Sequence, residues 1–163
     1  MSLIIATFQH ERWKDCETDI RGLVDAHWRE IALDQDRIPL DIDFEMYRRL
    51  DAETFTLHVT TARERGNLIG YYVNVIRPHP HYKGTLFGFL DAFFILPSYR
   101  QGPLGIQLFQ HMEREMRGLG VKSLISISKN HHNVLPLFER LGWKAVGVTC
   151  QKWIGPTPYM EVA

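Results

Sequence analysis

The sequence reads Phe93-Phe94-Ile95-Leu96-Pro97-Ser98-Tyr99-Arg100-Gln101-Gly102-Pro103-Leu104-Gly105-Ile106 at the point that decides the fold. An apolar run ends at a proline, a glycine-bearing turn follows, and apolar residues then recur at helical spacing. The first amides of a helix have no internal acceptor and lie at the positive end of its dipole. Such a turn can therefore hold a diphosphate, and Pro103 suits the first helical position.

The same turn also fits an ordinary strand-to-helix connection, because short glycine patterns match many sequences. No Gly-Lys-Ser/Thr closes it, which excludes a nucleotide P-loop. Its glycines also lack the Gly-x-Gly-x-x-Gly spacing of a dinucleotide site. The turn alone leaves both an anion site and a plain connection open.

Outward from the turn, the period of the apolar residues predicts the other elements. Steps of three and four predict helices, whereas alternation or a continuous apolar run predicts strands. We expect loop at 78–81, because proline cannot donate to a ladder. The order predicts an α+β (mixed α/β) fold with a central sheet, as one domain over residues 1–163. The expected helices are 13–32, 44–50, 104–119 and 134–141, and the expected strands are 54–61, 68–76, 86–96, 121–128 and 143–150.

Composition excludes several classes of protein. Lys plus Arg and Asp plus Glu number 19 each, so no bulk basic charge supports nucleic-acid binding. Cys16 and Cys150 are too few for a disulfide scaffold and lack metal-site spacing. No apolar run is long enough to cross a membrane, and the start lacks a basic segment, so we expect a soluble, cytoplasmic protein. The histidine pairs at 79/81 and 131/132 lie in predicted loops without further ligands, so we expect no metal.

Two segments resemble one enzyme family. Residues 95–105 resemble the Val-x-Pro-x-Tyr-Arg-Gly-x-Gly-Ile-Gly signature of the GCN5-related N-acetyltransferases (GNAT). Leu137-Phe138-Glu139-Arg140-Leu141-Gly142-Trp143 is similar to that family's Leu-Tyr-Glu-Lys-Leu-Gly-Phe segment. The resemblance covers residues 54–154. The ending Trp153-Ile154-Gly155 is similar to the corresponding segment of small phage and prophage members of the family. It implies a mostly antiparallel sheet that splays at the cofactor site, and transfer of acetyl from acetyl-CoA to an amine in a ternary complex.

The resemblance also implies which residues hold acetyl-CoA. The pyrophosphate would lie on the turn and the pantetheine arm along the central strand. Pro103 stands where the family has a glycine and removes one phosphate donor, worth about 1–3 kcal/mol if that amide is used. The implied cofactor-binding residues are Phe93, Phe94, Ile95, Arg100, Gln101, Gly102, Pro103, Leu104, Gly105, Asn130, Asn133 and Phe138.

The catalytic candidates are Asp91 and Tyr99. Asp91 lies in the predicted central strand, where a carboxylate in apolar surroundings can relay the proton of an attacking amine. It can equally bond backbone or pair with an arginine. Phe138 matches a tyrosine that often serves the family as general acid, and it cannot donate a proton. Tyr99, Ser128 or a water held by Asn130 or Asn133 would then protonate the thiolate.

The acceptor stays open among a small molecule, a protein amine and a modified nucleobase. The loop at 78–84 is expected to shape its pocket, because loops at strand ends commonly carry specificity. A homodimer is a further possibility, with exposed aromatics such as Tyr82, Trp153 and Tyr159 at its interface. The rival hypothesis is a CoA-binding or protein-interaction module that kept the fold and lost turnover, which Phe138 and Pro103 favour.

Overall fold

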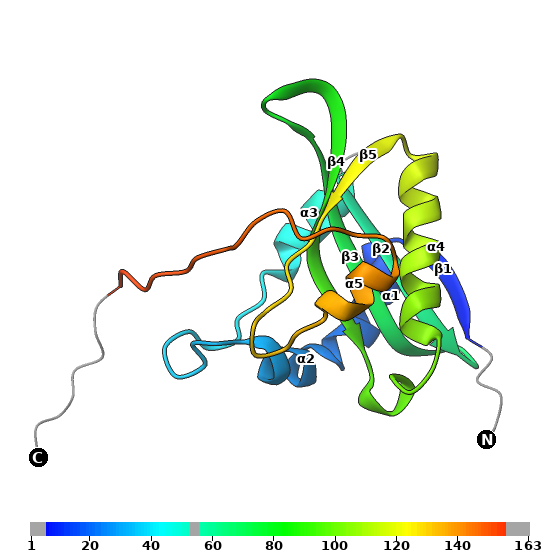
Figure 1. Ribbon diagram of the computed structural model, residues 1–163. Coiled ribbons are helices and arrows are strands. Elements are labelled where there is room, and N and C mark those ends of the chain that lie inside the picture. Colours follow the sequence, from blue (N-terminus) through cyan, green and yellow to red (C-terminus); the bar gives the residue numbers. More distant parts are fainter. Residues whose placement is uncertain (1–5, 53–55, 156–163) are drawn as a thin grey trace, which may run out of the picture.

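The computed structural model describes residues 6–52 and 56–155 of the 163-residue chain (Figure 1). It contains a five-stranded sheet in the order β1-β2-β3-β4-β5, flanked by helices, which confirms the predicted α+β fold. The elements are β1 (Thr7–Glu11), α1 (Trp13–Arg21), α2 (Val24–Ile31), α3 (Phe44–Ala52), β2 (Leu57–Glu64), β3 (Asn67–His79), β4 (Tyr82–Ile95), the short 3-10 helix η1 (Pro97–Tyr99), α4 (Leu104–Gly118), β5 (Val121–Ile125) and α5 (Leu135–Arg140).

The sheet is antiparallel from β1 to β4, and β5 pairs with β4 in parallel. This last pairing is short, running from Leu86 opposite Val121 to Phe89 opposite Ile125. β4 continues to Ile95, whereas β5 ends at Ile125, so within the described residues the second half of β4 has a free edge. The predicted splay of the sheet is therefore present.

Helices cover both faces of the sheet (Figure 1). On one face, α1–α3 pack on a cluster that includes Trp13, Tyr71 and Phe94. On the other face, α4 and α5 pack on clusters that include Tyr72 and Phe109. These five side chains are at most 3% exposed, and burying a large apolar side chain stabilises a fold by about 1.5–3 kcal/mol. Packing on both faces thus fixes the position of the free edge.

Two predictions need correction and one strand was missed. The expected helix over 13–32 is two helices, because the chain turns at Gly22, where Gly22 and Leu23 bond back to Asp19 and Ile20. β1 was not expected. Pro78 belongs to β3 rather than to a loop, and the hairpin turns at 80–81. The amide of Ile76 donates to Thr56, away from β4, so by alternation the nitrogen of Pro78 also faces away from β4 and the ladder with β4 needs no amide there.

The predicted strand over 143–150 is wrong. The segment pairs with no strand in the described ranges, and Val146 and Val148 are 94% and 90% exposed. Alternating valines are not sufficient for a strand, because backbone groups also need a ladder partner. In Figure 1 the segment runs away from the sheet toward the C-terminus. The strand expected over 54–61 is found at Leu57–Glu64, and residues 53–55 lie outside the described part.

A search of the described residues finds no helix with both the length and the apolar character needed to cross a bilayer.

Candidate functional site

The turn before α4 has the geometry of an anion site. Gly102 has φ of 129°, a backbone conformation that side-chain-bearing residues rarely adopt, and α4 begins two residues later. Fifteen residues of helix then follow with their N-terminal end at the turn. Among the described residues nothing accepts hydrogen bonds from four backbone amides here, those of Gln101, Gly102, Leu104 and Gly105.

The side chain of Arg100 does not occupy this turn. Its guanidinium bonds Glu30 of α2 bidentately, at 2.5 and 2.7 Å, and donates through Nε to the carbonyl of Ile95 at 2.8 Å. It also lies 5.4 Å from the ring centroid of Phe94. Hydrogen bonding from Arg100 holds the pKa of the Glu30 carboxyl below its ordinary value. Arg100 therefore fastens the turn to α2, and its side chain does not cover the backbone amides of the turn.

The free edge of β4 presents alternate backbone groups. The amide of Leu96 donates to the carbonyl of Ile69, which places Phe94 in a hydrogen-bonded pair with β3. By this alternation the amide and carbonyl of Phe93 and Ile95 face away from β3, toward the free edge. Phe94, also expected to bond the pantetheine arm, instead directs its backbone to β3 and buries its side chain.

Asp91 is the bulged residue of β4. Val73 pairs with Ala92 and Asn74 with Leu90, so Asp91 is left over in the ladder. Its carboxylate accepts a hydrogen bond from Tyr47 of α3 at 2.5 Å. Asp91 is exposed rather than enclosed in apolar surroundings, which corrects the expectation. Burial, followed by the Asp91 charge and its hydrogen bond, raises the pKa of Tyr47, so that Tyr47 stays protonated and donates.

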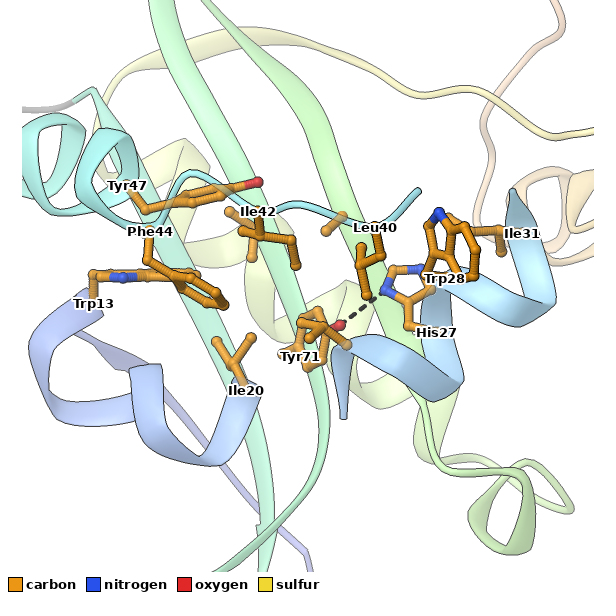
Figure 2. Close-up of a pocket in the computed structure, with 13 residues that line it drawn as sticks. Trp13, Ile20, His27, Trp28, Ile31, Leu40, Ile42, Phe44, Tyr47 and Tyr71 are labelled. Atoms are coloured by element: carbon orange, nitrogen blue, oxygen red, sulfur yellow. Dashed lines mark hydrogen bonds between the residues drawn. The ribbon is translucent and has the colours of Figure 1, made fainter. Parts of the chain in front are cut away.

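Beside Asp91 lies an apolar pocket of about 150 Å³ between α1–α3 and the sheet (Figure 2). Tyr71 and His27 point toward one another in it, with the Tyr71 hydroxyl 2.8 Å from Nδ1 of His27. Burial lowers the pKa of His27 to about 4, so the imidazole is neutral at pH 7. The lining residues are Trp13, Ile20, Val24, His27, Trp28, Ile31, Leu40, Ile42, Phe44, Tyr47, Tyr71, Val73 and Ala92.

Two buried hydroxyls meet where β4 and β5 separate, a feature that sequence reasoning missed. Tyr72 belongs to β3, yet its hydroxyl lies near that of Ser126, just past the end of β5. The Tyr72 side chain therefore passes under β4 into the gap. Neither hydroxyl has a well-formed hydrogen bond within the described chain, nor does the buried amide of Asn74. Unpaired buried groups at the splay suggest a site where a ligand supplies the missing partner.

Tyr99 is not brought together with Asp91. Its hydroxyl donates to Glu64 at the end of β2, 2.8 Å away, and its ring packs with the residues under α4. Asp91 bonds α3 on the opposite face of the sheet. The hydrogen bond to Glu64 raises the pKa of Tyr99, which further disfavours a role as proton donor.

The second motif forms the start of α5. Asn133 accepts the amide of Leu135 at 2.9 Å, and Ser128 accepts the amides of Val134 and Leu135. These bonds satisfy the amide of Leu135, the first residue of α5, and that of Val134, which precedes the helix. Asn130 is exposed in the preceding loop. Phe138 is 4% exposed and packs on Phe109 and Trp143, so it belongs to the core.

The remaining expectations concern loops and metals. No residue of 78–84 lines the apolar pocket described above, because that hairpin extends beyond the helices. His131 bonds the carbonyl of Ile31, and His132 lies 3.3 Å from Glu30. No group of three potential metal ligands occurs in the described ranges.

Comparison with known proteins finds one matching family model and several similar solved structures. The family model of the acetyltransferase (GNAT) family matches residues 17–143. Aminoglycoside acetyltransferase AAC(6')-Iy, solved with the bisubstrate analogue CoA-S-monomethyl-acetylneamine, is similar with TM-score 0.71 and 18% identity, over 93% of this chain and 99% of that one. An aminoglycoside acetyltransferase from an uncultured soil metagenomic sample, in complex with sisomicin, gives 0.69 and 9%, over 94% and 97%.

A ribosomal-protein-alanine N-acetyltransferase from Brucella melitensis biovar Abortus 2308 is also similar, with TM-score 0.65 and 14% identity, over 93% of this chain and 99% of that chain. At these identities the likeness to solved structures concerns the fold. No curated protein matches the sequence.

Proposed function

Because this chain belongs to the acetyltransferase (GNAT) family, we propose that it transfers the acetyl group of acetyl-CoA to an amine by direct attack in a ternary complex. The donor supplies a thioester, whose carbonyl carbon the amine attacks. The nitrogen–carbon bond forms, the carbon–sulfur bond breaks, and the electron pair leaves with the sulfur. The chain's own residues would hold the donor, orient the amine and receive its proton, which is mainly catalysis by proximity.

One observation carries this proposal: the unpaired amides at the start of α4 lie next to the free edge of β4. Gln101, Gly102, Leu104 and Gly105 offer donors to a pyrophosphate at the positive end of the helix. Phe93 and Ile95 offer an amide and a carbonyl each along the edge, although Arg100 already bonds the Ile95 carbonyl. The residues present thus fit a ligand with an anionic head and an amide-bearing arm.

Asp91 is proposed as the proton acceptor. An alkylammonium has a pKa near 10.4 and must lose a proton before it attacks. The Asp91 carboxylate is exposed at the bulge, next to the free edge, so an amine or a bridging water can reach it. Tyr47 holds one of its oxygens at 2.5 Å, which orients the other.

Tyr72 replaces Tyr99 in the proposal as the donor to the leaving sulfur. Its hydroxyl is buried in the gap between β4 and β5 without a well-formed bond. Burial raises its pKa, so the hydroxyl would stabilise the departing thiolate by a hydrogen bond rather than by full proton transfer. This arrangement explains how the site can work although Phe138 lacks a hydroxyl.

The rival function is a CoA-binding module without turnover, which the buried Phe138 and the missing amide of Pro103 favour. Purified protein mixed with acetyl-CoA and a panel of primary amines, with free thiol followed over time, separates the two. We expect amine-dependent thiol release. CoA binding seen by calorimetry, without thiol release on any amine, would instead establish the module, and silence in both assays would refute both functions.

A further inference from the structure

None of the described residues that line the apolar pocket beside Asp91 carries a charged side chain at pH 7. Among the 13 lining residues only His27, Tyr47, Tyr71 and the two tryptophans carry polar side-chain atoms, and His27 and Tyr71 bond each other. A polyamine or aminoglycoside carries several positive charges, and each needs a carboxylate or water when it leaves solvent. This lining offers neither carboxylate nor other anion, so it does not suit such an acceptor.

The size of the pocket indicates what it would hold. Its volume of about 150 Å³ equals that of engineered apolar cavities that stay dry and bind benzene. Aromatic side chains form one end, where Trp13 and Tyr47 stack with ring centroids 4.4 Å apart. A single ring or a short branched alkyl group would fill this space, and its burial would supply the binding energy.

The side of the pocket next to Asp91 indicates where the amine of the acceptor would bind. Ala92 lines the pocket, and Asp91 precedes it in β4. Tyr47 lines it as well and donates to the Asp91 carboxylate. Asp91 therefore lies at the border of the pocket, where an ammonium group can pair with it while an attached apolar group lies inside.

We infer that the acceptor is a primary amine carrying one compact apolar or aromatic group, bound with that group in the pocket and its nitrogen at Asp91. This inference rests on the proposed function and narrows its substrate class. The neighbouring acetyltransferases solved with aminoglycosides share the fold, but the apolar lining here separates this chain from that substrate class.

The first test compares acceptors by thiol release. We expect kcat/KM for 2-phenylethylamine to exceed that for methylamine, spermidine and kanamycin by about 10- to 100-fold, as burial of a ring predicts. Val24→Phe adds bulk to the pocket lining and should lower kcat/KM for 2-phenylethylamine about tenfold, leaving methylamine within about twofold. Leu33→Phe introduces the same side chain at a 60% exposed position outside the lining and is the control.

The outcomes are distinct. A preference for spermidine or kanamycin, or equal behaviour of Val24→Phe and Leu33→Phe, would overturn the inference while the proposed function stands. If no amine releases thiol, the proposed function fails, and a binding measurement then decides whether the pocket takes an amine of this class. Trp13 and Trp28 line the pocket, so saturable quenching of tryptophan fluorescence by 2-phenylethylamine should occur in wild type and Leu33→Phe but not in Val24→Phe. No quenching in wild type would overturn it.

A second variant keeps the test decisive should Val24→Phe fail to fold. Leu40→Ala removes bulk from the loop that closes the pocket, and Leu40 is only half-buried, so the fold should tolerate the change. We expect it to raise kcat/KM for 2-(1-naphthyl)ethylamine at least fivefold relative to 2-phenylethylamine. An unchanged ratio between the two acceptors would count against the pocket as the acceptor site.

Discussion

Replacing Asp91 by Asn separates a proton acceptor from a structural carboxylate. In the structure the Tyr47 hydroxyl lies 2.5 Å from the Asp91 carboxylate. The asparagine side chain keeps an oxygen to accept this hydrogen bond, and the exposed bulge has room for the amide nitrogen. The fold should therefore change little, within about 0.5 kcal/mol of unfolding free energy, as for other exposed positions. Only the negative charge and the basic site are lost.

The expected kinetic effect follows from the role. Loss of a general base lowers the rate about 10²- to 10⁴-fold, equivalent to about 3–5 kcal/mol of barrier. The KM for acetyl-CoA should stay unchanged, because Asp91 belongs to the acceptor side. The deficit should shrink toward pH 10, where more of the amine is already deprotonated.

Thiol release measured between pH 6 and 10 on wild type and Asp91→Asn, with Tyr47→Phe as the variant that keeps the carboxylate, provides the assay. A rate within twofold of wild type at every pH would refute Asp91 as the base. A parallel loss of thermal stability and activity would assign it a structural role instead.

Three further variants test other parts of the account. Tyr72→Phe removes an unpaired buried hydroxyl, so melting temperature should hold or rise while kcat falls about tenfold; unchanged kcat would refute the sulfur contact. In wild type the pKa of His27 is about 4, below the ordinary 6.5, so the unfolded chain binds a proton at higher pH than the folded one, and about 3 kcal/mol of unfolding free energy is lost as pH falls from 6.5 to 4. His27→Gln should remove this pH dependence of the unfolding free energy, measured by denaturant titration. Arg100→Ala should cost about 1–3 kcal/mol in the same titration, since it breaks the bonds to Glu30 and Ile95; an unchanged midpoint would contradict the fastening role.

Local patterns in the sequence carried most of the fold. The apolar run into Pro97 and the stripe from Leu104 onward predicted the strand, turn and helix that form the proposed anion site, because these signals depend only on residues close in sequence. Residues 143–150 show where such reasoning stops. Their alternation is that of a strand, but pairing depends on a partner edge, which local period does not encode.

The site divides in the same way. Motif and position predicted Asp91 and the turn as parts of the site, whereas they predicted neither Tyr72 nor the apolar pocket. Tyr72 reaches Ser126 only because β3, β4 and β5 adopt a particular order, and their separation in sequence is large. The residues that line the pocket come from α1, α2, α3, the loop before α3 and two strands, so no single segment of the sequence predicts it. Contacts between distant segments need the register of the sheet, which periodicity leaves open.

The central claim concerns backbone amides, and hydrogen exchange followed by NMR measures them directly. On addition of saturating CoA, the account predicts slower exchange at Gln101, Gly102, Leu104 and Gly105, together with Phe93 and Ile95, while Phe94 stays as protected as in the free protein. Unchanged exchange across residues 100–105 in protein that calorimetry shows to be CoA-bound would contradict it.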